Sequence, residues 1–162
     1  MAKRSLSIAS FTPVAYADTT NLVNGNYLGV IQGGSATQRV VISECMLAGQ
    51  ATSSAPTIML LSRDTTVAAT LGATTTTDAP LDASTAALAA PPLVGNTFTT
   101  APQRSATAHL LNLSLNAFGG IVRWLAAPGE EITIIGNTQP LGEVSLSCFT
   151  GGTPGLLGGH MI

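Results

Sequence analysis

The feature that most constrains this fold is a two-residue alternation of apolar and polar side chains in short runs. Between residues 111 and 116, leucines alternate with asparagine and serine, and segment 144–148 alternates apolar residues with serine. A period of two places successive side chains on opposite faces of an extended strand. Segments 38–47 and 57–62 are more continuously apolar, which is typical of strands covered on both faces. These patterns predict β-strands, and no stretch carries a convincing helical stripe.

Turn residues separate these runs. Pro128-Gly129 fits the central pair of a type II turn, because proline fixes φ and glycine takes the positive value. Paired glycines at 33–34 and 119–120 mark further breaks. Short strands separated by such turns are typical of a sandwich or barrel, so we predict an all-β fold of about eight strands. Candidate starts lie near Leu28, Arg39, Ile58, Val67, Phe98, His109, Ile121, Ile132 and Val144, one of them uncertain.

The 162 residues fit one domain with two ends of different composition. Residues 1–20 mix aromatic residues with proline and serine, and residues 151–162 are glycine-rich with an apolar finish. We expect an N-terminal arm over 1–20, a β domain over 21–150 and a C-terminal tail over 151–162. Between residues 65 and 102, threonine, alanine and proline dominate. Two interpretations stay open for this excursion, a surface loop or a contact between subunits.

The low charge of the chain bears on its partners. Charged residues make up 9% of the chain, against about 25% in an average soluble domain. Such a surface repels copies of itself weakly, which suits packing against neighbours, although a threonine-rich monomer would look the same. The net charge is −2 and the six basic residues are scattered, which disfavours direct nucleic-acid binding. No apolar run approaches the roughly 18 residues of a membrane helix, so no membrane partner is expected.

No set of residues predicts catalysis or a bound cofactor. Residues 33–37 resemble a nucleophile elbow but lack its final glycine. The three aspartates between residues 64 and 82 match no calcium-loop spacing. The chain has two histidines, His109 and His160, too few to predict a metal site. We therefore predict no enzyme, with no catalytic, metal-binding or cofactor-binding residues; a hydrolase built around His109 is the rival interpretation.

Cys45 and Cys148 each fall inside a predicted strand. A disulfide between two sheets and a pair of buried free thiols are both possible from the sequence. We favour free thiols, because cysteine is among the most buried residue types.

Arg123 and Trp124 form the most informative pair, since Trp124 is the one tryptophan in the chain. Adjacent strand residues face opposite ways. Either Trp124 anchors the core and Arg123 is solvated, or one of the two lies in a subunit interface, where both types are enriched. With the aromatic residues of the N-terminal arm, the candidate interface residues are Phe11, Tyr16, Arg123 and Trp124.

Residues 121–137, IVRWLAAPGEEITIIGN, resemble small jelly-roll proteins of tailed-bacteriophage heads. Those decoration, or cement, proteins sit on the capsid lattice, commonly as trimers, and clamp neighbouring major capsid subunits. The resemblance implies an antiparallel β-sandwich of the jelly-roll type and a homotrimer that binds the major capsid protein. It also implies that the chain is made in the host cytoplasm and located on the capsid exterior of the virion. It carries over no catalytic residue.

A different function class is also compatible with a jelly roll. The chain is then a receptor-binding or carbohydrate-binding module of a phage fibre or spike. Such a module requires an exposed aromatic or carboxylate platform, and aromatic residues make up only 4% of this chain.

Overall fold

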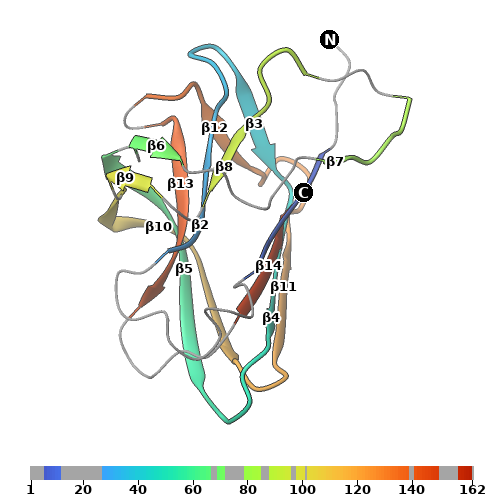
Figure 1. Cartoon of the computed structure of the whole chain (residues 1–162), viewed down its shortest axis with the longest axis vertical. Coiled ribbons are helices and arrows are strands. Elements are labelled where there is room, and N and C mark those ends of the chain that lie inside the picture. The colour runs from blue at the N-terminus through green and yellow to red at the C-terminus, as the bar shows by residue number, and fades with distance from the viewer. Residues whose placement is uncertain are drawn as a thin grey trace.

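The structure is a computed structural model that describes residues 6–11, 27–66, 69–71, 79–84, 88–95, 98–100, 102–138, 141–149 and 157–161. All secondary-structure elements within these residues are β-strands, and every pair of neighbouring strands is antiparallel. The all-β antiparallel fold predicted from the alternation is therefore confirmed (Figure 1).

Two five-stranded sheets form the body of the molecule (Figure 1). Sheet 1 has the order β11 (Ile121–Leu125), β4 (Glu44–Gly49), β14 (Leu157–Met161), β1 (Leu6–Phe11) and β7 (Ala79–Pro80). Sheet 2 has the order β10 (Gln103–Asn116), β5 (Pro56–Thr66), β13 (Glu143–Phe149), β2 (Tyr27–Gln32) and β8 (Leu93–Gly95). Two-stranded ribbons pair β3 (Arg39–Ile42) with β12 (Ile132–Ile135) and β6 (Ala69–Leu71) with β9 (Phe98–Thr100).

The two ends of the chain differ from the expected arm and tail. Residues 6–11 and 157–161 form β1 and β14, which pair with each other inside sheet 1. Glycine has a low intrinsic strand preference, so the composition of residues 157–161 hides the strand. Neighbouring strands on both sides supply its hydrogen bonds instead.

The excursion between residues 65 and 102 also contains strands. The pairs Ala69–Thr100 and Leu71–Phe98 continue the β5–β10 ladder in the register of Thr66 and Gln103. Further along, β7 pairs with β1 at the edge of sheet 1, and β8 pairs with β2 at the edge of sheet 2. The described part of the excursion therefore adds one edge strand to each sheet.

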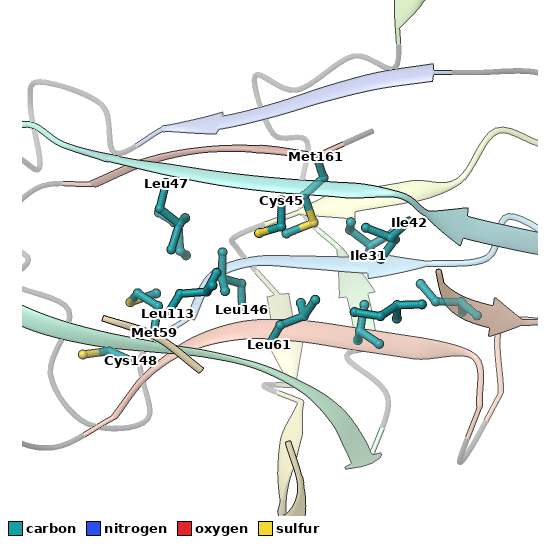
Figure 2. Close-up of a cluster of buried hydrophobic side chains, with 14 of the residues drawn as sticks. Ile31, Ile42, Cys45, Leu47, Met59, Leu61, Leu113, Leu146, Cys148 and Met161 are labelled. Carbon is teal, nitrogen blue, oxygen red and sulfur yellow. The ribbon is translucent and has the colours of Figure 1, made fainter. Parts of the chain in front are cut away.

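The core lies between the two sheets. Figure 2 shows Cys45, Leu47 and Met161 of sheet 1 above Met59 and Leu61 of sheet 2. All five are buried, and Cys45, Leu47, Met59 and Leu61 are fully so. Truncating a buried leucine of this kind to alanine costs about 2–5 kcal/mol. Four of these side chains come from the continuously apolar segments 38–47 and 57–62, and Met161 comes from the predicted tail.

Candidate interaction surface

Strand β11 presents an apolar face to the outside of sheet 1. The side chains of Ile121 and Leu125 are 72% and 63% exposed, and Arg123 lies between them on the same face. Trp124 points the other way and packs, partly buried, against the core. The predicted opposite orientation of Arg123 and Trp124 is confirmed. Trp124 contributes to packing, and Arg123 is on the outside.

The neighbouring strand β4 widens this face. Register places Met46 opposite Arg123 and Ala48 opposite Ile121, and both are partly exposed. We call the set Met46, Ala48, Ile121, Arg123 and Leu125 the β11 surface. Antiparallel sheets that face water usually carry polar residues on the outside. An outward face with isoleucine and leucine at its most exposed positions is therefore a candidate for contact with another molecule.

A paired charge lies at the centre of the β11 surface. Arg123 Nε and Nη2 donate to Glu44 Oε1 and Oε2 at 2.8 and 2.9 Å. This two-pronged geometry fits the planar guanidinium to the carboxylate. The hydrogen bonds to Glu44, together with its charge, raise the pKa of Arg123. Glu44 is itself buried, so the pair presents almost no net charge to a partner.

Phe118 adds an apolar side chain next to β11. It is 58% exposed in the turn over residues 117–119, where Gly119 has a φ of 72°. Phe118, Ile121 and Leu125 were not among the residues predicted from sequence. The signal was nevertheless present, because a tryptophan facing the core forces Ile121 and Leu125 to face outward.

The two aromatic residues predicted from the N-terminal arm are less informative. Phe11 is the last residue of β1 and lies opposite Gly158 of β14, which in turn lies opposite Ala48 of the β11 surface. Its backbone is therefore in line with the β11 surface across sheet 1. Tyr16 lies outside the described residues.

Sheet 2 carries a row of polar side chains across four strands. Register places Glu143 opposite Gln32 and Asp64 opposite Arg104, and Glu143 lies next to Asp64 because Val144 pairs with Arg63. We call Gln32, Glu143, Asp64 and Arg104 the polar row. Asp64 and Glu143 are only 2% and 1% exposed. Two of the eight acidic residues of the chain are therefore buried side by side.

Hydrogen bonds connect the side chains of this row, although Asp64 Oδ2 is buried without a hydrogen-bond partner among the described residues. Gln32 Nε2 donates to Glu143 Oε2 at 2.8 Å, and Ser145 Oγ donates to Asp64 Oδ1 at 2.6 Å. Burial raises the pKa of Asp64, against the opposing effects of hydrogen bonds from Ser145 and Glu143 and of the Arg104 charge. Two adjacent buried carboxyl groups do not both ionise readily, so we infer that the pair holds a proton.

His109 does not assemble a hydrolytic site in the described part of the chain. Its Nδ1 lies 2.9 Å from Ser62 Oγ, and the imidazole is exposed. Ser62, however, is fully buried and has no access to a substrate. Asp64, two residues further along β5, bonds to Ser145 instead of to the histidine. The described residues also contain no group of three metal-ligating side chains placed to hold a metal ion.

Cys45 and Cys148 are free and buried, so the favoured interpretation of the two cysteines is confirmed. They lie on different sheets, at opposite sides of the core cluster in Figure 2. Burial, with a smaller effect of the Glu44 charge, raises the pKa of Cys45 to about 12. Burial also raises the pKa of Cys148. Neither thiol is therefore suited to act as a nucleophile at neutral pH.

No protein-family model, curated protein or solved structure matches this chain. Within the described residues there is also no helix long and apolar enough to cross a membrane.

Proposed function

We propose that this protein is a capsid decoration protein, which binds the lattice of the major capsid protein on the outside of a phage head and stabilises it. The observation that carries the proposal is the β11 surface. It combines exposed apolar side chains with one internally neutralised charge on a regular sheet. A surface of this kind suits attachment to a protein better than binding of a small charged ligand.

The strand order supports the jelly-roll part of the proposal. Among the described residues, eight strands have five or more residues, and they divide into the orders β1-β14-β4-β11 and β2-β13-β5-β10. Strands adjacent in each sheet are distant in sequence, as in a sandwich of two interleaved Greek keys. The short strands β7 and β8 are additions at the edges.

The composition of the β11 surface predicts how attachment responds to salt. Salt screens interactions between exposed charges and weakens apolar contacts much less. Because Glu44 already neutralises Arg123, few charges remain for a partner to use. A modest contact suffices in an array, since many copies act together on one particle.

The test is co-sedimentation of the purified chain with phage heads assembled without it. We expect binding in low salt that persists in about 1 M salt, where the screening length falls to about 3 Å. Replacing Ile121 and Leu125 together by threonine should abolish binding, whereas Glu130→Gln, at an exposed turn position, should not change it. Release by moderate salt, or full binding by the double variant, would contradict the proposal.

The receptor-binding or carbohydrate-binding alternative has less support. The carboxylates of the polar row are buried, so they do not form an open platform. Phe118 is the one aromatic side chain described as exposed. Binding of the soluble chain to an arrayed set of glycans, lost on Phe118→Ala, would favour this alternative over decoration.

A further inference from the structure

The open edges of the two sheets are not equally protected. An open edge exposes unpaired backbone groups, and natural proteins protect such edges with short strands, proline, lysine or bulges. At the far edge of sheet 1, β7 has two residues and ends in Pro80, while β8 of sheet 2 has three residues. The register shifts of β10 interrupt its ladder before Leu111, and its regular part, residues 111–116, exposes the polar side chains of Asn112, Ser114 and Asn116. Strand β11 has five residues in continuous register without proline, and Glu44 of the same chain binds its one charged side chain, Arg123.

The alternation of hydrogen bonds along β11 shows which of its backbone N–H and C=O groups are not bonded to β4. Two bonds flank the strand, from Gly49 N to Gly120 O at 2.8 Å and from Ala126 N to Ser43 O at 2.9 Å. In an antiparallel pair, residues alternate between bonding to the partner and pointing away from it. The even-numbered residues of β11 therefore bond to β4, and the odd-numbered residues direct their N–H and C=O groups to the open side.

These odd-numbered residues are Ile121, Arg123 and Leu125, the same three that carry the exposed side chains. In the part of the chain that the structure describes, their backbone groups on the open side have no partner. We propose that β11 pairs antiparallel with β11 of a second copy of this chain, about a two-fold axis at Arg123. The pairing joins two copies of sheet 1 into one continuous sheet.

The register of this pairing is self-complementary. Ile121 of each copy lies opposite Leu125 of the other, and Arg123 lies opposite its own equivalent. All three positions are hydrogen-bonded pairs, which gives about six backbone hydrogen bonds, two for each pair. On the core-facing side, Val122 lies opposite Trp124 of the other copy, and both are only partly buried within one chain. A two-fold contact needs such a self-matching surface.

The charges at the centre are compatible with this pairing. Two arginines directly opposite each other would repel. Here each guanidinium is already bound by Glu44 of its own chain, so the row Glu44–Arg123–Arg123–Glu44 is neutral overall. Apolar pairs flank it on both sides. This match of charge and register is the reason to assign the edge to a second copy rather than to an unrelated strand.

This contact goes beyond the proposed function and holds whether or not the chain binds a capsid. A two-fold contact produces dimers, whereas the resemblance to decoration proteins implies a trimer. The paired edge is only five residues long, shorter than the interfaces of permanent dimers, so we expect a weak dimer. On a lattice, weak pairing between neighbours would be strengthened by their enforced proximity.

The first experiment is the solution mass of the purified full chain, measured by light scattering over a hundredfold dilution. We expect a mass approaching two chains at high concentration and one chain at low concentration. Leu125→Lys places a charge on the paired edge and should raise the dimer dissociation constant at least about tenfold. Leu93→Lys, at an exposed position on the protected edge strand β8, is the matched control and should leave it unchanged.

Amide hydrogen exchange locates the contact. In the dimer, the amides of Ile121, Arg123 and Leu125 should be protected at high concentration and should exchange rapidly on dilution. The amides of Val122 and Trp124 bond to β4 and should be protected at both concentrations.

A monomer at every concentration, a trimer, or a dimer unaffected by Leu125→Lys would overturn the inference. These results involve no capsid. A failure of the proposed function would instead appear as lost co-sedimentation with heads, while the solution mass stayed concentration-dependent.

Discussion

The two sheets have unusual outer faces: exposed positions carry apolar side chains on sheet 1, and polar side chains are buried on sheet 2. The outer face of sheet 1 is exposed and apolar at Ile121 and Leu125. The outer face of sheet 2 carries Asp64 and Ser145, directed away from the core, together with the apolar Val30 and Leu60, and all four are buried. Polarity alone therefore does not distinguish the covered face of this sandwich from the open one.

The difference shows two ways in which a sheet face constrains a protein. Buried polar groups must find partners inside the chain, so the polar row fixes the register of four neighbouring strands. Exposed apolar groups find no partner inside the chain, so the β11 surface is left for a contact outside it. One face specifies the fold, and we propose that the other specifies what the fold binds.

The largest effect should come from breaking the polar row. Asp64→Ala leaves the Ser145 hydroxyl without its acceptor and the Arg104 charge without its nearby carboxylate. We expect the free energy of unfolding to fall by about 3 kcal/mol, as for other buried charged partners. Urea denaturation measures it, with Glu130→Ala at an exposed turn as the control, where a change within about 0.5 kcal/mol is expected. If Asp64→Ala and Glu130→Ala lowered the free energy of unfolding equally, the buried polar row would not stabilise the fold more than an exposed turn does.

The second effect is a dependence of stability on pH. Because the pKa of Asp64 is raised in the folded state, the folded chain keeps a proton that the unfolded chain releases. This stabilisation is fully present below about pH 4 and is lost as the pH rises through the raised pKa. Within that window the free energy of unfolding falls by up to about 1.4 kcal/mol per pH unit. Asp64→Asn should flatten the profile in urea titrations, and an unchanged profile would exclude the shared proton.

Removing Arg123, the charge partner of Glu44 on the outer face of sheet 1, should lower stability less than Asp64→Ala does. Arg123→Ala leaves the carboxylate of Glu44 buried without its guanidinium, so stability at neutral pH should fall. Acidification should restore part of the loss, because a protonated Glu44 no longer needs a cation. Thermal unfolding of Arg123→Ala and of the unchanged chain, in dilute protein at pH 5 and at pH 7, measures the loss of stability and its recovery. The double variant Arg123→Ala with Glu44→Gln should be less affected than Arg123→Ala alone.

The smallest effect on stability should come from the β11 surface itself. Replacing Ile121 and Leu125 by threonine places β-branched, strand-compatible side chains at these exposed positions. We expect the free energy of unfolding to change by no more than about 0.5 kcal/mol. A loss of several kcal/mol, measured by urea denaturation, would show that these side chains pack within their own chain.

Much of the fold was predictable because alternation directly records which face of a strand is covered. Leu113 is buried while Asn112 and Ser114 are exposed, as their spacing predicts. The alternation was less informative in β13, where the serines are as buried as their apolar neighbours. A single strand does not reveal that its polar face is buried as well.

The candidate surface was only partly predictable. Sequence reasoning selected Arg123 and Trp124 by residue type, and their opposite orientation followed from strand geometry. It did not identify Glu44, because the ion pair depends on the register between β4 and β11, two strands distant in sequence. Register over such distances is set by the whole sheet and leaves no local signal.

The central pairing of β1 with β14 has a consequence for how the chain acquires its fold. In sheet 1, the first and last described strands of the chain lie side by side, with β14 between β1 and β4. During synthesis, β1 and β4 leave the ribosome before β14, the strand that pairs with both of them. Sheet 1 therefore closes only after residues 157–161 have left the ribosome. Slow, late closure exposes strand edges for longer, which makes unfinished chains prone to aggregate.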